Sequence, residues 1–124
     1  MNNKELVLTA ITAVFVKRDI TAFDKYFSEN YIQHNPQLPN GTEVLKQFVP
    51  TLGEDFNYEP GIITENENIV MIHGRYENWG GKNMIAVDIF RVENGKIAEH
   101  WDVMQEEITA DKTANGNAMF PINL

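Results

Sequence analysis

Residues 96–105 read KIAEHWDVMQ and place a histidine, a tryptophan and an aspartate side by side in a predicted β-strand. His100 and Asp102 are two positions apart, so their side chains lie on the same face of that strand. On a face exposed to water they would be ordinary surface charges. On a face that lines an enclosed pocket, Asp102 could act as a general acid or base. The elements around this strand decide between the two interpretations.

A second carboxylate, Asp88, lies in the middle of an apolar row. Its neighbours on the same face of the strand predicted at 83–93 are Met84, Ala86, Phe90 and Val92. A carboxylate on a buried apolar face is costly unless it takes a partner or a proton. Two interpretations stay open for Asp88, a structural salt bridge to an arginine or lysine and a functional carboxylate.

The Asn-Gly turn between these two strands sets which residues face each other. A two-residue turn places Asp88 opposite Trp101, whereas a three-residue turn, with the glycine as a left-handed bulge, places Asp88 opposite His100. We expect the three-residue turn, because it gathers Asp88, His100 and Asp102 on one concave face.

The two other histidines lie where they could join this group. His73 alternates with apolar residues in the strand predicted at 68–78, and His34 lies in the YIQHNP segment. Taken singly, a buried histidine is more often a hydrogen-bonded core residue, and a loop histidine is more often just polar. We expect all three histidines to converge with the two carboxylates. A metal site made from His34, His73 and a carboxylate has suitable ligand types, but no HxH or HxxxH spacing supports it, and we expect no metal.

Three helices are predicted ahead of the strands. Apolar residues at three- and four-residue spacing from Leu6 to Phe15 indicate an amphipathic helix that Asn2 or Asn3 can cap. Thr21 is expected to cap a short second helix, AFDKYF, and Asn40 or Thr42 a third, TEVLKQFVPTLG. The segment NYIQHNPQLPNG between the second and third helices contains two prolines, three asparagines and a glycine, and a loop is expected after Gln33.

From residue 56 onward the apolar period changes to two. Strands are predicted at 56–64, 68–78, 83–93 and 96–107, with connectors short enough for antiparallel hairpins. Helices followed by a strand meander predict an α+β fold, with the helices packed on one side of a curved, mainly antiparallel sheet.

Composition limits the class of protein. The 124 residues fit one domain covering 1–124, and the net charge of −8 makes nucleic acid and anionic membranes poor partners. There is no cysteine, so thiolate catalysis and cysteine-based zinc sites are excluded. The apolar N-terminal stretch is interrupted by Thr9 and Thr12 and is followed by no cleavage site, so a cytoplasmic protein is expected.

Five segments of the chain resemble the SnoaL-like polyketide cyclases: YIQHNP, the NG before the third helix, IHGRYE, DIFRVENGKIAEHWDV and ANGNAMF. More narrowly, they resemble bacterial SnoaL-like proteins described as predicted aldol-condensation enzymes, within the nuclear-transport-factor-2-like superfamily. The resemblance spans nearly the whole chain. RVENGKIAEHWDV is the segment specific for the superfamily branch, whereas YIQHNP and ANGNAMF indicate the narrower group.

The resemblance implies a conical α+β barrel, in which three helices are wrapped by a strongly bent sheet and a pocket opens at the wide end. It implies that Asp102 is the acid/base of an intramolecular aldol ring closure and that the polar residue at position 88 lies near it. It also implies that no metal or organic cofactor is used, and that two copies form a homodimer through the outer face of the sheet. An apolar row on that face, Ile85, Val87 and Ile89, favours the same dimer.

The function predicted is that of a small cofactor-independent enzyme with acid/base chemistry on an apolar carbonyl substrate, of the aldol-condensation, cyclase, lyase or isomerase type. The alternative is a non-catalytic module that binds a small apolar ligand in the same pocket. The expected catalytic residues are Asp102, Asp88, His34 and His73. The expected substrate-binding residues are His100, Tyr31, Asn35, Trp79, Met84 and Phe90.

Overall fold

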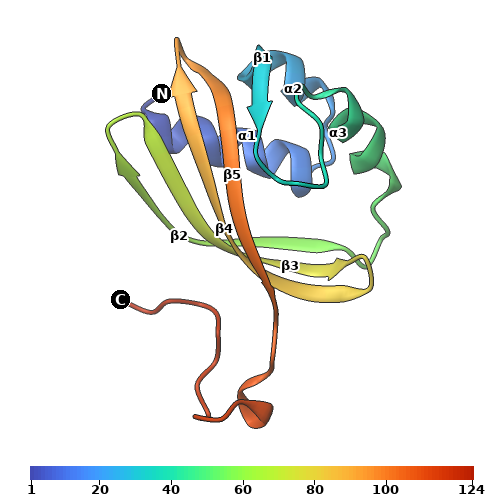
Figure 1. Cartoon of the computed structure of the whole chain (residues 1–124), viewed down its shortest axis with the longest axis vertical. Helices are drawn as coiled ribbons and strands as arrows, with labels where there is room; N and C mark the ends of the chain where they lie inside the picture. Colours follow the sequence, from blue (N-terminus) through green and yellow to red (C-terminus); the bar gives the residue numbers. More distant parts are fainter.

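One curved sheet of five strands forms the body of the protein, and the helices cover its concave face (Figure 1). The structure is a computed structural model that describes residues 1–124. In chain order its elements are α1 (Asn3–Phe15), α2 (Thr21–Tyr26), β1 (Phe27–Gln33), α3 (Glu43–Phe48), β2 (Asn57–Asn66), β3 (Ile69–Trp79), β4 (Lys82–Glu93) and β5 (Lys96–Glu106), with 3₁₀ turns at Val49–Thr51 and Ala110–Lys112. The predicted α+β fold with a curved, mainly antiparallel sheet is confirmed.

The sheet contains one strand that the sequence does not predict. The order of strands is β1-β5-β4-β3-β2, and β1 pairs with β5 in parallel while every other pair is antiparallel. The sequence of β1, FSENYIQ, has three polar residues in a row and therefore lacks the alternation of a strand. Its parallel pairing places Gln33 opposite His100.

The helices begin close to the predicted residues, with one correction. The Asn2 side chain caps α1 by accepting the Glu5 backbone N–H at 2.8 Å, as predicted. Thr21 does not cap α2. It lies in the first turn, and its N–H and hydroxyl donate to the Asp19 carboxylate at 3.0 and 2.6 Å. These two hydrogen bonds lower the pKa of Asp19.

The turn between β4 and β5 is not the predicted three-residue turn. Glu93 pairs with Lys96 across a two-residue turn, and Asn94 and Gly95 both have positive φ, at 51° and 71°. The bulge lies further along β5, at Ala98, because Val92 pairs with Ile97 but Arg91 with Glu99.

That extra residue shifts the register by one. Asp88 therefore faces Asp102, and neither Trp101 nor His100. Asp88, His100 and Asp102 still share the concave face, so the predicted grouping is correct although the predicted turn is wrong.

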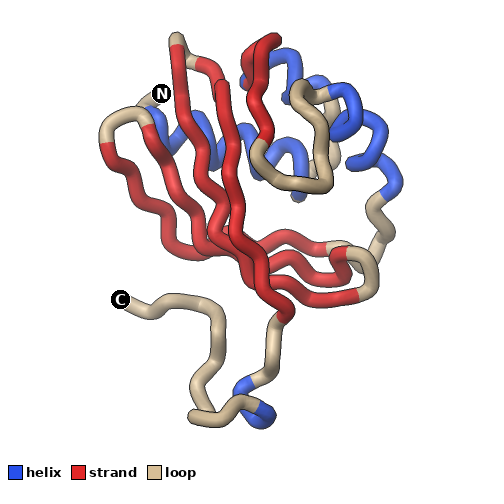
Figure 2. Tube along the Cα trace, in the orientation of Figure 1, coloured by secondary structure: helices blue, strands red, loops and turns tan.

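The core lies between the concave face and the helices. It contains 20 buried residues, and Ile72 of β3 and Val14 of α1 are fully buried in it. After β5 the chain passes beneath the convex face as a segment with little regular structure (Figure 2). Phe120 of this tail is buried against His73 on the convex face, with ring centroids 5.4 Å apart.

None of the helices could cross a membrane. α1 is the longest, with 13 residues. A membrane-spanning helix needs about 20 consecutive apolar residues.

The burial pattern of β3 gives a direct test of which face holds the core. Replacing Ile72, which is fully buried, with alanine should lower the free energy of unfolding by about 2–5 kcal/mol through lost burial and an unfilled cavity. The neighbouring Met71 points to the convex face and is 39% exposed, so Met71→Ala should cost less than about 1 kcal/mol. Urea unfolding of both variants measures the difference, and equal losses would contradict this assignment of faces.

Candidate active site

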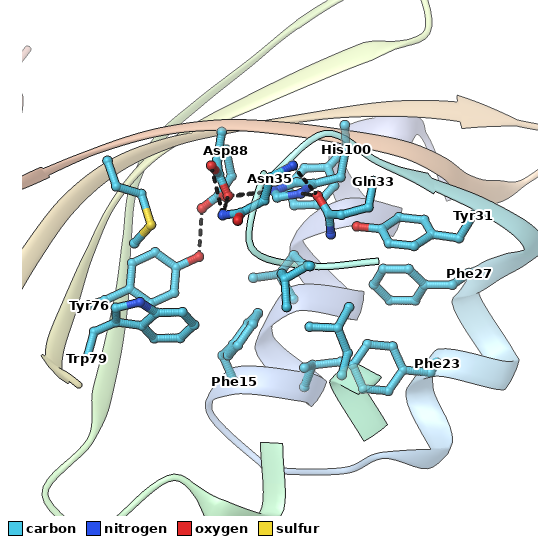
Figure 3. A pocket seen from close by; sticks show the side chains of 17 residues that line it. Phe15, Phe23, Phe27, Tyr31, Gln33, Asn35, Tyr76, Trp79, Asp88 and His100 are labelled. Atoms are coloured by element: carbon cyan, nitrogen blue, oxygen red, sulfur yellow. Dashed lines mark hydrogen bonds and ion pairs between the residues drawn. The ribbon is translucent and has the colours of Figure 1, made fainter. Parts of the chain in front are cut away.

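A cavity opens between the concave face of the sheet and the helices, with about 540 Å³ of empty space counting its mouth. Seventeen residues line it, and 12 of them are hydrophobic, so a ligand inside would contact mainly apolar walls (Figure 3). The apolar and aromatic residues are Ile11, Val14, Phe15, Phe23, Phe27, Tyr31, Leu38, Leu45, Tyr76, Trp79, Phe90 and Met104. The polar ones are Gln33, Asn35, Asp88, His100 and Asp102.

Asp88 is held by two hydrogen bonds at the polar end of the cavity. The Tyr76 hydroxyl donates to its Oδ2 at 2.6 Å, and His100 Nε2 lies 2.8 Å from its Oδ1. No arginine or lysine lines the cavity. The salt bridge to arginine or lysine that the sequence left open for Asp88 is therefore absent, and its partners are an imidazole and a phenol.

Asp102 has a different set of partners. The Asn35 side-chain amide donates to its two carboxylate oxygens at 3.1 and 2.9 Å. His100 Nε2 is 3.8 Å from its Oδ2, beyond hydrogen-bonding distance. A carboxylate can accept about four hydrogen bonds, so Asp102 keeps acceptor capacity that a ligand in the cavity can use.

The tyrosines of this site are hydrogen-bond donors. Burial, followed by the nearby Asp88 carboxylate, raises the pKa of Tyr31 and of Tyr76 far above the ordinary value of about 10. Both phenols therefore carry their proton at neutral pH. Tyr76 uses its proton on Asp88, while the Tyr31 hydroxyl points toward Gln33 (Figure 3).

Gln33 is a polar centre of the site. Its Oε1 accepts the backbone N–H groups of His34 and Asn35 at 3.1 and 3.0 Å and lies 2.6 Å from His100 Nδ1. Among the hydrogen-bonding residues at the polar end of the cavity, Gln33 and Tyr76 are the two that sequence reasoning does not identify. Alternation along β3 places Tyr76 on the same face as Ile72 and could have indicated it. Gln33 gives no such signal, because β1 is not predicted.

The expected convergence of three histidines is wrong for two of them. His73 lies on the convex face of β3, beneath Phe120, because it pairs with Val87 and alternates with the buried Ile72. His34 lies outside the cavity as well, and its side chain is exposed.

His34 has partners of its own on the convex face. Its Nε2 is 2.6 Å from Glu99 Oε2, and its ring stacks on Trp101 with centroids 4.8 Å apart. Glu99 also accepts Arg91 Nε at 2.8 Å. These hydrogen bonds, that of His34 first, lower the pKa of Glu99.

Five of the six residues expected to bind substrate line the cavity. They are His100, Tyr31, Asn35, Trp79 and Phe90. Met84 does not: it is half buried on the concave face and packs against the core beyond the cavity.

One group of side chains has the composition of a metal site. Single ligand atoms of Asp88, His100 and Asp102 lie within 4.8 Å of one another. His100 Nε2 and Asp88 Oδ1 are already paired at 2.8 Å, so a metal bound by both residues would have to displace this hydrogen bond. The metal set considered from the sequence, His34 and His73 with a carboxylate, is not assembled, because the one group whose ligand atoms converge contains neither histidine.

Comparison with solved structures identifies the fold. An NTF2-like protein of unknown function from Cytophaga hutchinsonii superposes with a TM-score of 0.72 at 23% identity, over 85% of this chain and 91% of that one. IdmH from Streptomyces antibioticus, a candidate polyketide cyclase, gives 0.64 at 16% identity over 84% and 92%. A candidate ketosteroid isomerase from Kribbella flavida gives 0.70 at 14% identity over 86% and 79%. At these identities the likeness establishes an NTF2-like fold.

The family follows from the sequence itself. The SnoaL-like domain profile matches residues 8–100, three quarters of the chain. The protein therefore belongs to the SnoaL-like domain family, as the sequence motifs indicated. Comparison with curated proteins gives no match.

The two buried tyrosines near Asp88 provide a matched test of this geometry. Tyr76→Phe leaves Asp88 Oδ2 without its donor, so the free energy of unfolding should fall by about 1–3 kcal/mol. The Tyr58 hydroxyl is also buried but has no hydrogen-bond partner, so Tyr58→Phe should be neutral or stabilising. Urea unfolding compares the variants, and a larger loss for Tyr58→Phe would refute the hydrogen bond to Asp88.

Proposed function

We propose that the protein is a small enzyme that performs acid/base chemistry on an apolar carbonyl compound inside this cavity, without a cofactor. The observation that carries the proposal is a pair of carboxylates facing each other, Asp88 and Asp102, at the polar end of an aromatic cavity. A carboxylate removed from water is a stronger base near neutral pH, and positioned acid/base catalysis contributes about a hundred- to ten-thousandfold.

Asp102 is the base in this proposal. It takes a proton from the carbon next to the carbonyl group, and the electron pair of that C–H bond forms a carbon–carbon double bond while the carbonyl electrons move to oxygen. The amide of Asn35 keeps the Asp102 carboxylate in one orientation for this step. In this proposal the Tyr31 hydroxyl, which lines the same cavity, donates a hydrogen bond to the enolate oxygen.

The enolate intermediate can then follow one of two courses. Attack of its carbon on a second carbonyl in the same molecule closes a ring, and the alkoxide formed takes the proton held by Asp102. Return of that proton to another carbon of the substrate instead isomerises it. Among the solved structures with this fold, one protein is a candidate polyketide cyclase and another a candidate ketosteroid isomerase, and both names fit chemistry that begins with this proton transfer.

The electrostatics of the cavity favour neutral substrates. Two carboxylates and a single histidine supply all its ionisable groups apart from tyrosines, and it has no lysine or arginine to bind an anion. A carboxylate, phosphate or sulfate on the substrate would be repelled at the polar end. The expected substrate is therefore a neutral ketone with an aromatic or alicyclic body.

Exchange of α-protons for deuterium tests the proposal without knowledge of the natural substrate. β-Tetralone in D₂O, followed by proton NMR, should exchange at least about a hundredfold faster with catalytic amounts of the protein than in buffer alone. Its ring-carboxylated analogue should gain less than a tenth of that acceleration. Saturable binding of the neutral ketone without exchange would instead support the non-catalytic binding module.

We further propose that two copies associate through the convex face of the sheet. Val103 is 70% exposed there and Met71 39%, with Val87 and Ile89 half buried beside them. Ile85 contributes less than the sequence suggested, because it is already buried within the protomer.

Light scattering at micromolar concentration should give about twice the chain mass of 14.2 kDa. Val103→Glu should return the mass to that of one chain, because it places a charge in the interface. Leu8→Glu changes an exposed leucine of α1 and should leave the dimer intact. A single-chain mass for the unaltered protein would contradict the proposal.

A further inference from the structure

The amide of Gln33 fixes the position of a proton on His100. Three groups approach the Gln33 Oε1 atom: Asn35 N–H at 3.0 Å, His100 Nδ1 at 2.6 Å and, at 3.1 Å, the His34 N–H, whose shorter hydrogen bond of 2.9 Å goes to the His100 carbonyl. The two backbone groups can only donate. If the amide were turned over, its NH₂ would face two donors, so the atom in this position is the oxygen. An oxygen accepts, and therefore His100 Nδ1 must carry a hydrogen.

The contact made by the other nitrogen of the same ring shows how many protons the Asp88–His100 pair holds. His100 Nε2 lies 2.8 Å from Asp88 Oδ1, a hydrogen-bonding distance that needs one proton between the two atoms. With Nδ1 already protonated, the pair is an imidazolium beside a carboxylate or an imidazole beside a carboxylic acid. Either way Asp88 and His100 together hold one proton more than a neutral histidine and an ionised aspartate would.

The surroundings are consistent with that extra proton. The ionisable groups facing His100 are Asp88 from β4, Asp102 from β5, and the phenols Tyr31 from β1 and Tyr76 from β3. None of them is a cation. The second oxygen of Asp88 is satisfied by the Tyr76 hydroxyl at 2.6 Å. Two carboxylates in one dry cavity with no lysine or arginine favour uptake of a proton.

We propose that Gln33 is a positioning residue that keeps this proton on the Asp88–His100 pair, making the pair the proton donor and leaving Asp102 as the proton acceptor. This assignment rests on the proposed function and divides its acid and base between the two carboxylates. Asp102 takes the proton from carbon, the carbonyl electrons move to oxygen, and that oxygen takes the proton held by the pair. The pair is then left as a neutral imidazole and a carboxylate, and the reverse transfers restore it.

The same segment of chain orients both partners. Gln33 and Asn35 alternate into the cavity, where one orients His100 and the other orients Asp102. His34, between them, points out and is held by Glu99. The QHN sequence at the end of β1 thus acts on the acid and on the base through two different side-chain amides.

Nitrogen NMR of the imidazole rings tests the assignment independently of any substrate. Correlation spectra of protein with ¹⁵N-labelled histidine should show a hydrogen on His100 Nδ1 at pH about 8. The His34→Gln and His73→Gln variants identify the His100 signals, since both of those side chains lie outside the cavity. An unprotonated Nδ1 in the unaltered protein would overturn the inference.

Two variants of Gln33 separate the hydrogen bond from the fold. Gln33→Leu removes the acceptor, so the neutral ring should move its proton to Nε2, where Asp88 accepts it. Gln33→Glu keeps an acceptor oxygen in place and should keep Nδ1 protonated. Backbone spectra confirm that each variant is folded. The inference is wrong if Gln33→Leu leaves the proton on Nδ1.

Kinetics give a second readout that a purely structural role would not produce. In the exchange assay Gln33→Leu should lose about tenfold or more at pH about 8 and much less at pH about 6, because acid restores the proton that the pair no longer retains. An equal loss at both values would contradict the role of Gln33 in holding the proton. If the NMR result holds but no ketone exchanges, the proposed function fails while the assignment of the His100 proton stands.

Discussion

Two carboxylates face each other across β4 and β5 inside an apolar cavity that has no lysine or arginine, and the rest of the site depends on how that charge is held. Leaving both unpartnered would cost several kcal/mol, so the structure provides a donor for each one. Asp88 receives a phenol and an imidazole, whereas Asp102 receives a side-chain amide. In the proposed mechanism this difference in partners separates the roles of the two carboxylates, since only Asp88 is hydrogen-bonded to other ionisable side chains.

Two irregularities of the sheet create the arrangement. The bulge at Ala98 shifts the register by one residue, so that Asp102 comes opposite Asp88 on the concave face. The parallel pairing of β1 with β5 brings Gln33 beside His100, and the backbone N–H of His34 donates to the His100 carbonyl at 2.9 Å. A regular antiparallel meander would place the same carboxylates out of register and leave the imidazole without its second partner.

The sequence predicts the fold well because the fold depends on periodic patterns. The amphipathic spacing in α1 and the alternation in β3, β4 and β5 are local signals, and so is the apolar row around Asp88. The site is predicted less completely, because contacts between distant segments decide it. Alternation along β3 does separate His73 from Ile72 and Tyr76, but nothing near His73 shows that a tail residue, Phe120, packs against it on the convex face. Gln33 is visible only once β1 is known to be a strand.

The proposed function takes Asp102 as the base, and the family resemblance favours the same residue by a different route. The motif around HWD indicates the position, and the structure supplies the reason that it differs from Asp88. It also accounts for the absence of His34 from the cavity, because the ring is stacked on Trp101 and paired with Glu99 on the other face. The proposed acid/base chemistry therefore involves fewer side chains than the sequence suggests, because His34 and His73 lie outside the cavity.

The most direct test of this account compares Asp102→Asn with Asp88→Asn in α-proton exchange of the same neutral ketone. Both substitutions preserve shape, and each removes one carboxylate. We expect Asp102→Asn to bind the ketone within a few fold of the unaltered protein and to lose the whole acceleration, about a hundred- to ten-thousandfold. Asp88→Asn should retain part of it, because the base remains. Full exchange by Asp102→Asn together with none by Asp88→Asn would contradict the central claim that Asp102 is the base.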